Sequence, residues 1–368
     1  MKLSTIELVR IAIPLVSPFR TSFGTETARD VLLVHLTTPE AEGWAECVAM
    51  GDPLYSSEYV DAAQHVMRTH LIPRLAAADG LTAARVAPAL HPVKGHRMAK
   101  AALETAVLDA ELRAAGTSLA THLGGVRDRV PAGVSVGIMD EIGQLLDAVD
   151  GYLAEGYVRI KLKIQPGWDL EPVRAVRERF GDDVLLQVDA NTAYAVGDWQ
   201  LLAALDPFDL LLIEQPLDEE DVRGHAQLAR LVRTPICLDE SIVSARAAAD
   251  AIAIGACSIV NIKPGRVGGY LESRRIHDVC VAHGIPVWCG GMLETGIGRA
   301  ANAALAALPG FTLPGDVSAS NRYYTQDVTD PFVLEDGHIT VPTGAGIGVE
   351  PLPEVLASLV TSRELIEL

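Results

Sequence analysis

From about residue 133 onward, the chain alternates short apolar runs with helix-like segments. The runs are GVSVG (133–137), VRIKLKI (158–164), VLLQVDAN (184–191), LLLIEQP (210–216), PICLDES (235–241), SIVNIKP (258–264), PVWCGG (286–291) and FTLPGD (311–316). Between them, apolar residues recur at intervals of three and four, as in helices that cover a sheet. Near-continuous apolar strands joined by such helices indicate a parallel sheet buried on both faces. Eight strands predict a closed (β/α) barrel, with an open doubly wound sheet as the alternative.

The first 125 or so residues have a different pattern, which predicts a separate α+β domain. Its strand-like runs lie at 3–13, 31–37 and 43–48, and its helical stretches at about 58–75 and 96–115. The tail from residue 324 contains the strand-like sequence FVLEDGHITV and is expected to return to this domain. Because 368 residues exceed the usual size of one core, we expect a division into 1–125, 126–323 and 324–368.

The composition, 49% hydrophobic and 21% charged, is typical of soluble globular proteins. A formal net charge of -18 and the lack of a basic run argue against nucleic-acid binding. The first 15 residues alternate like a strand, and no apolar stretch reaches the ~20 residues that cross a bilayer. Five scattered cysteines without C-x-x-C spacing predict neither disulfides nor a zinc site. We therefore expect a cytoplasmic protein with no nucleic-acid or membrane partner.

Reactive side chains recur at the ends of five predicted strands. They are Lys163, Asp189, Glu214, Asp239 and Lys263, each 24 to 26 residues after the previous one. This spacing is about one strand–helix unit, so all five should share the carboxyl-terminal rim, where barrel enzymes build their active sites. Three neighbouring carboxylates repel one another unless a cation compensates them. Oxygen-only ligands indicate Mg²⁺, for which Mn²⁺ or another divalent ion would substitute.

Two further features concern the lysines. Lys161 and Lys163 stand two apart on one strand, so both should point into the barrel, where lysines are rarely placed without a role. Beside a cation and each other, their neutral forms are favoured. Lys263 lies four strands after Lys163 and should face it across the barrel mouth. Two bases on opposite sides of one carbon permit racemisation, epimerisation or elimination of a β-leaving group, and a metal would stabilise the enolate that forms.

Several motifs resemble those of the muconate-lactonising subgroup of the enolase superfamily. They are KLKI, VDAN, IEQP, LDES, NIKPGRVGG and WCGGMLETG, with PFRTSFGT and VAMGDPLYSSEY near the start. Within the subgroup, the chain resembles the N-acylamino acid racemase / o-succinylbenzoate synthase family over essentially its whole length. Mandelate-racemase-like relatives carry a histidine on the seventh strand, and Ala-Glu epimerase-like relatives carry Asp-x-Asp on the last; PVWCGG and GDVS have neither. The resemblance implies an α/β fold: an enolase-like (β/α)7β TIM-type barrel with an α+β capping domain built from the N-terminal region and the C-terminal tail.

The resemblance also implies a role for individual residues. The metal ligands would be Asp189, Glu214 and Asp239, and the acid/base pair Lys163 and Lys263. Lys161 would touch the substrate carboxylate, Asn191 would lie near the metal, and Arg266 resembles an arginine typical of members that racemise acylamino acids. The other implied pocket residues are Phe19, Phe23, Met50 and Tyr55 from a loop region that closes over the mouth, and Ser135, Gly291, Met292, Leu293 and Tyr323 from the barrel side.

The implied reaction is Mg²⁺-dependent removal of the proton next to a substrate carboxylate. Reprotonation would racemise an N-acylamino acid, and loss of water from a cyclohexadiene carboxylate would give o-succinylbenzoate for menaquinone synthesis. Muconate cycloisomerase or dipeptide epimerase activity on the same scaffold is the alternative. A barrel retained for binding without turnover is a third reading, which the intact set of five rim residues disfavours. The family also implies a homo-oligomer.

Overall fold

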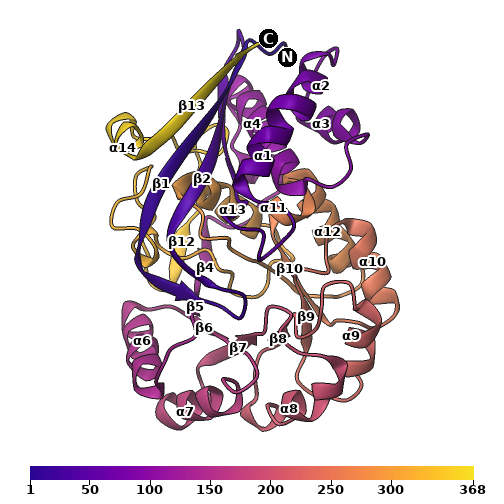
Figure 1. The fold of residues 1–368 in the computed structure, drawn as a ribbon, viewed down its shortest axis with the longest axis vertical. Helices are drawn as coiled ribbons and strands as arrows, with labels where there is room; N and C mark the ends of the chain where they lie inside the picture. The colour runs from indigo at the N-terminus through magenta and orange to yellow at the C-terminus, as the bar shows by residue number, and fades with distance from the viewer.

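The computed structural model describes residues 1–368 and shows a capping region next to a barrel, with both chain termini at the far end of the capping region (Figure 1). The capping region is built on a four-stranded antiparallel sheet of order β13-β1-β2-β3. Its strands are β1 (Thr5–Arg20), β2 (Thr25–Thr37), β3 (Glu42–Cys47) and β13 (Val360–Glu367). Since β13 pairs along β1, the last residues of the chain complete the sheet that the first residues begin.

The capping helices pack beside this sheet. They are α1 (Val60–Val66), a π-helical turn (Met67–Leu71), α2 (Ile72–Ala76), α3 (Ala83–Leu90), α4 (Arg97–Ala115) and α5 (Leu119–Leu123). Helix α4 lies directly on β3, because a Cβ on Gly43 would stand only 2.1 Å from the carbonyl oxygen of Ala106. The alanine-rich helix is buried around most of its circumference and ends at Gly116 in the left-handed conformation. Among its buried side chains are two carboxylates, Glu104 and Asp109.

The barrel is a seven-stranded parallel sheet in sequential order from β5 to β11. Its strands are β5 (Gly133–Val136), β6 (Arg159–Lys163), β7 (Leu185–Asp189), β8 (Ile213–Glu214), β9 (Ile236–Leu238), β10 (Ile259–Ile262) and β11 (Val287–Cys289). The connecting helices are α6 (Ile142–Glu155), α7 (Leu170–Phe180), α8 (Trp199–Ala203), α9 (Val222–Leu228), α10 (Ala245–Ala253), α11 (Pro264–Val267), α12 (Tyr270–Ala282) and α13 (Gly296–Ala306). Short 3-10 turns lie at Val196–Asp198, Asp206–Phe208 and Ser320–Arg322.

The expected eighth strand, 311–316, is not a regular strand. Instead, this segment closes the barrel through single bridges, Phe311 with Val287 on one side and Gly315 with Ala132 on the other. Pro314 has no N–H to donate, which prevents a continuous ladder. The amide of Asp316 still donates to the carbonyl of Cys289, at 2.8 Å. Because both edges of the sheet bond to the same segment, the open doubly wound alternative is excluded.

The FVLEDGHITV part of the tail does not join the capping sheet, contrary to expectation. Its strand β12 (His338–Thr340) pairs with β4 (Arg129–Pro131), which leads into the barrel. This pairing is local to the barrel, and the chain returns to the capping sheet only after α14 (Pro353–Leu359). One continuous hydrophobic core contains side chains from both regions.

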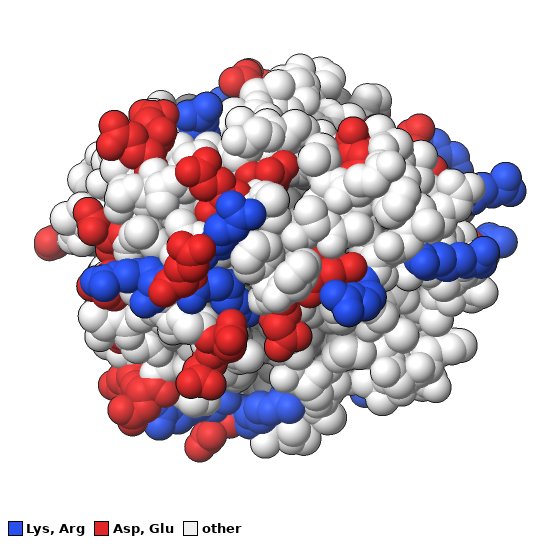
Figure 2. Space-filling model, turned by 90° about the horizontal axis from the view of Figure 1, so that it is seen from below, with Lys and Arg blue, Asp and Glu red and all other residues white.

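On the face seen in Figure 2, acidic and basic side chains are interspersed, and no continuous basic area forms there. No helix combines the length and apolar character that crossing a bilayer requires. All five cysteines are buried as free thiols.

Candidate active site

The structure brings the five spaced rim residues to one end of the barrel. Lys163, Asp189 and Glu214 are the last residues of β6, β7 and β8, while Asp239 and Lys263 directly follow β9 and β10. In the parallel ladder, Lys163 is paired with Asp189, and Asp189 with Glu214. All five side chains are buried. The strand–helix repeat therefore gives the shared rim that the spacing predicts.

Hydrogen bonds within the barrel hold the Lys163 side of the rim. The Lys163 Nζ lies 2.6 Å from Asp189 Oδ2 and 2.6 Å from Asn191 Oδ1. The neighbouring Lys161 Nζ lies 3.1 Å from Glu214 Oε2 and 3.5 Å from Asp189 Oδ2, and it also binds Asp316. One positive charge thus already lies between two of the three rim acids.

The Lys263 side involves the capping region as well. The Lys263 Nζ lies 2.8 Å from Asp239 Oδ2, 3.1 Å from the Tyr55 hydroxyl and 4.7 Å from the centroid of the Tyr55 ring. Arg266 binds the other oxygen of Asp239 and donates to the carbonyls of Ile242 and Asn261. Arg266 is therefore a buried residue behind Asp239, and it does not line the cavity.

The pKa values of the two acid/base candidates are shifted in opposite directions. Burial lowers the pKa of Lys163, and the neighbouring charge of Lys161 lowers it further, although Asp189 opposes both. For Lys263, burial also lowers the pKa, but Tyr55 and nearby acids outweigh it and raise the pKa above its ordinary value. In the same way, the acids around Lys161 outweigh burial and raise its pKa. The same ammonium charges hold the pKa of Asp189 below its usual range in spite of burial.

The three rim acids do not form a preformed metal cage. No three histidine, cysteine, aspartate or glutamate side chains stand around one point in an arrangement that would hold an ion, because each rim carboxylate is turned towards a lysine or arginine. The donor set nevertheless fits a hard divalent cation: it offers only oxygen atoms, is fully buried, and comes from three consecutive strands. Glu240, next to Asp239, adds a buried Oε2 that has no hydrogen-bond partner.

Backbone strain is concentrated where strands end at the site. Asn191, Thr192, Gln215 and Leu293 all have positive φ, between 36° and 66°, without being glycine. At Gln215 the strained backbone accompanies a contact to the next strand. The buried Oε1 of Gln215 accepts the backbone amide of Asp239 at 2.9 Å. Such residues hold the rim side chains in place, and sequence spacing alone did not identify Gln215.

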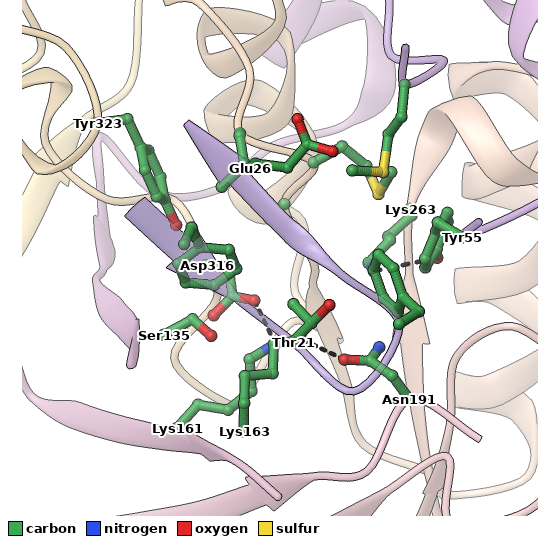
Figure 3. Close-up of a pocket in the computed structure, with 16 residues that line it drawn as sticks. Thr21, Glu26, Tyr55, Ser135, Lys161, Lys163, Asn191, Lys263, Asp316 and Tyr323 are labelled. Atoms are coloured by element: carbon green, nitrogen blue, oxygen red, sulfur yellow. Dashed lines mark hydrogen bonds and ion pairs between the residues drawn. The ribbon is translucent and has the colours of Figure 1, made fainter. Parts of the chain in front are cut away.

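A cavity opens between the rim and the capping region (Figure 3). Its lining contains every residue that the resemblance implied for the pocket except Arg266: Phe19, Phe23, Met50, Tyr55, Ser135, Lys161, Asn191, Gly291, Met292, Leu293 and Tyr323. Lys163 and Lys263 line it too, and lie on different sides of it in Figure 3. The sequence reasoning missed Thr21, Glu26 and Asp316. Asp316 ends the eighth apolar run and was detectable as a further strand-end acid. Thr21 lies within the PFRTSFGT motif, in the loop of residues 19–25 that was expected at the barrel mouth, whereas Glu26 left no signal.

A buried ion-pair network lies beneath this cavity. Arg159 lies 2.8 Å from Asp316 Oδ1 and 5.3 Å from the centroid of the Trp288 ring, while Lys161 lies 4.8 Å from that ring. Arg159 and Lys161 together outweigh burial and hold the pKa of Asp316 below its usual range. The network fixes Lys161 against the barrel floor, with its amine at the cavity.

These features define an enolase-type barrel, and comparison with known proteins places the chain accordingly. Residues 144–355 match the model of the enolase C-terminal domain-like family, and residues 4–124 match the mandelate racemase / muconate lactonizing enzyme N-terminal domain. The chain belongs to the mandelate racemase / muconate lactonizing enzyme family of the enolase superfamily.

Individual relatives narrow the position within the superfamily. The chain is 71% identical to an N-succinylamino acid racemase from Amycolatopsis sp, over 99% of each chain. It is 43% identical to an o-succinylbenzoate synthase from Bacillus subtilis (strain 168), over 99% of this chain and 98% of that one. A solved structure of an enolase-superfamily member from Listeria innocua Clip11262 is 39% identical, with a TM-score of 0.95, and the match covers 100% of this chain and 99% of that one.

Proposed function

We propose that this enzyme moves the proton on the carbon next to a substrate carboxylate, with Lys163 and Lys263 as the acid/base pair. The observation that carries the proposal is the placement of these two buried amines on different sides of one cavity, four strands apart in the barrel. A substrate carbon between them could lose a proton to one lysine and receive a proton from the other.

We also propose that Asp189, Glu214 and Asp239 hold Mg²⁺, with Mn²⁺ or another divalent ion as a substitute. The bound ion would supply Lewis-acid stabilisation of the enolate, which is the known chemistry of enolase-superfamily sites. Support comes from the buried, oxygen-only donor set and from the unused Oε2 of Glu240 beside it.

The remaining residues of the cavity have the properties that this reaction needs. Lys161, fixed by Asp316, presents its amine at the cavity and suits contact with the substrate carboxylate. Phe19, Phe23 and Met50 of the capping region cover the cavity with apolar side chains and would exclude water. Asn191 would orient Lys163, to which it is already hydrogen-bonded.

The reaction favoured by the relatives is racemisation of N-acylamino acids, because the 71% identical Amycolatopsis relative is named an N-succinylamino acid racemase. Elimination of water from a cyclohexadiene carboxylate to give o-succinylbenzoate, a menaquinone precursor, needs the same lysines and is the second candidate, supported by the relative of that name. Muconate cycloisomerase or dipeptide epimerase activity remains the alternative on this scaffold. We further propose a cytoplasmic homo-oligomer whose capping region comprises residues 1–125 together with the final strand β13, and whose barrel comprises residues 126–323, with β12 packed beside it.

The test is an exchange and turnover assay in deuterated buffer with Mg²⁺. Both enantiomers of N-succinyl and N-acetyl amino acids, the cyclohexadiene precursor, a muconate and a dipeptide would be supplied separately. We expect α-deuterium incorporation and racemisation with the N-acyl substrates. Exchange with none of these carboxylates would refute the proposal, and turnover of the muconate or dipeptide alone would favour the alternative.

A further inference from the structure

The segment that carries Lys263 and Arg266 is docked on the capping region. A Cβ on Gly265 would stand 2.2 Å from Val48 Cγ2, and a Cβ on Gly269 would stand 2.0 Å from Glu104 Oε1. Gly269 also has a φ of 132°, which favours glycine. The glycines of the KPGRVGG motif therefore allow close approach of two capping side chains to the turn that follows β10.

Glu104 is the polar contact in this docking. It projects from α4, is 2% exposed, and its Oε1 accepts the amide of Leu271 at 3.1 Å. Leu271 belongs to the first turn of α12, the 13-residue helix that begins four residues after Arg266. The carboxylate thus binds the N-terminus of α12, the helix that follows the turn carrying Lys263. Burial raises the pKa of Glu104 to about 7, although the amides of Leu271 and Tyr270 oppose the shift.

Glu46 makes the equivalent contact one barrel unit further on. It lies on β3, is 8% exposed, and its Oε2 accepts the amide of Thr295 at 3.0 Å and the Thr295 hydroxyl at 2.7 Å. Thr295 is the residue that precedes α13, and the segment before it carries Met292 and Leu293 of the cavity wall. The capping region therefore fixes two rim segments through two buried glutamates, and only the Glu104 segment bears an acid/base lysine.

Lys163 has a more indirect link to the capping region, through the Ser22 hydroxyl, which donates to the backbone carbonyl of Asn191 at 3.2 Å. The Lys163 side chain is hydrogen-bonded to Asp189 and Asn191, both of the barrel, and its backbone lies within the ladder between β5 and β7. A disturbance of the α4–α12 contact would therefore move Lys263 more than Lys163.

We propose that Glu104 is a positioning residue for Lys263, which acts from the capping region through the turn between β10 and α12. The inference rests on the proposed two-lysine proton transfer. Because the two lysines serve opposite faces of the substrate carbon, removal of the Glu104 contact impairs proton exchange from one enantiomer and spares the other. A loss of general stability would impair both enantiomers alike.

The experiment measures Mg²⁺-dependent α-deuterium incorporation into each enantiomer of an N-succinyl amino acid. The variants Lys163→Ala and Lys263→Ala first establish which enantiomer depends on Lys263. For Glu104→Ala we expect the kcat for that enantiomer to fall by about tenfold or more, and the kcat for the other by less than about threefold, since small displacements of a catalytic group have large kinetic effects. Glu104→Gln keeps an oxygen that accepts the Leu271 amide and should restore near-equal exchange.

Asp109→Ala is the matched control. Asp109 lies on the same helix, is 1% exposed, and accepts the backbone amides of Trp44 at 2.8 Å and Ile347 at 2.7 Å, neither of which belongs to the rim. Its loss should lower stability without any preference between enantiomers. If Glu104→Ala does not fold, the shorter Glu104→Asp is measured instead, with a smaller asymmetry in the same direction expected.

The outcomes separate this inference from the function on which it rests. If the wild-type enzyme exchanges neither enantiomer, or if both lysine variants lose the same one, the two-lysine function is wrong. If the lysine variants behave as expected but the Glu104 variants slow both enantiomers equally, the positioning role is wrong and the function stands.

Discussion

The two halves of the barrel rim hold their lysines in different ways. Lys163 is the last residue of β6, with strands on both sides, and its amine is bound by Asp189 and Asn191 of the barrel. Lys263 stands where the chain leaves β10, and its amine is bound by Asp239 and by Tyr55 of the capping region. One proposed acid/base group is therefore built into the barrel, and the other belongs to the junction between the two regions.

The positions of the two lysines therefore depend on different parts of the molecule. The barrel ladder fixes Lys163 through backbone hydrogen bonds that form with the fold itself. Lys263 depends in addition on side chains of the capping region, which also covers the cavity.

The largest effect is expected from removal of either lysine. In the presence of Mg²⁺, Lys163→Ala and Lys263→Ala should each reduce racemisation by about 10²–10⁴-fold, because each removes a general acid/base group. Exchange into opposite enantiomers should survive in the two variants, as read by NMR in deuterated buffer, while circular dichroism stays unchanged. Racemisation by Lys263→Ala at the wild-type rate would contradict the two-base scheme.

Removal of the divalent ion should affect both halves of the rim equally. Treatment with a chelator is expected to lower exchange of both enantiomers by at least about 10²-fold, since the enolate loses several kcal/mol of stabilisation. Addition of Mg²⁺ or Mn²⁺ should restore both. A chelated enzyme that retains full exchange would exclude the proposed role of the three rim acids.

Removal of a single hydrogen bond to one lysine should slow exchange of one enantiomer more than the other. The slowed enantiomer should differ between Lys163 and Lys263. Tyr55→Phe removes the hydroxyl 3.1 Å from Lys263 but keeps the ring, and Asn191→Ala removes the amide 2.6 Å from Lys163. Each lost bond is worth about 1.5–3 kcal/mol next to a charged group, so we expect exchange on the affected face to slow by roughly 10- to 100-fold. The kcat of each enantiomer in the two variants is the measurement. The same asymmetry in both variants would mean that the two halves are not independent.

The smallest effect is a pH dependence of stability at the junction. Burial and the charge of Glu294 raise the pKa of Glu46 from 4.5 to about 8. A raised carboxyl pKa means that the folded state holds its proton longer than the unfolded state, so stability falls as the pH rises from 4.5 to 8. Glu46→Gln removes this dependence. Relative to wild type, its free energy of unfolding should therefore increase by roughly 1 kcal/mol between pH 6 and pH 7.

Urea denaturation at the two pH values measures this change, and Glu178→Gln, at an exposed position on α7, is the control. The control should track the wild-type enzyme at both pH values. If the free energy of unfolding of Glu46→Gln changes between the two pH values as it does in the wild-type enzyme, Glu46 is not the source of the pH dependence of stability.

Sequence spacing predicted most of the rim, because one strand–helix unit has a nearly constant length and brings each successive strand end to the same edge. It did not predict the irregular closing segment, where Pro314 interrupts the ladder, or the path of FVLEDGHITV along β4. Arg266 could not be placed either, since its position behind Asp239 depends on the short helix α11.

Contacts between distant segments were beyond the reach of a single sequence. Glu46 and Glu104 looked like ordinary strand and helix residues, and only packing of the capping region on the barrel turns them into partners of helix N-termini. Thr21 and Glu26 reach the cavity for a related reason. The hairpin formed by β1 and β2 extends from the capping sheet as far as the mouth of the cavity. Local pattern carried information about each region, and tertiary packing determined how the two regions meet.

The most direct measurement is a crystal structure of the enzyme with Mg²⁺ and an N-succinyl amino acid. We predict carboxylate oxygens of Asp189, Glu214 and Asp239 at about 2.0–2.1 Å from one ion, with the Nζ atoms of Lys163 and Lys263 on opposite faces of the α-carbon. An ion bound elsewhere, or both amines on the same face of that carbon, would contradict the proposed chemistry.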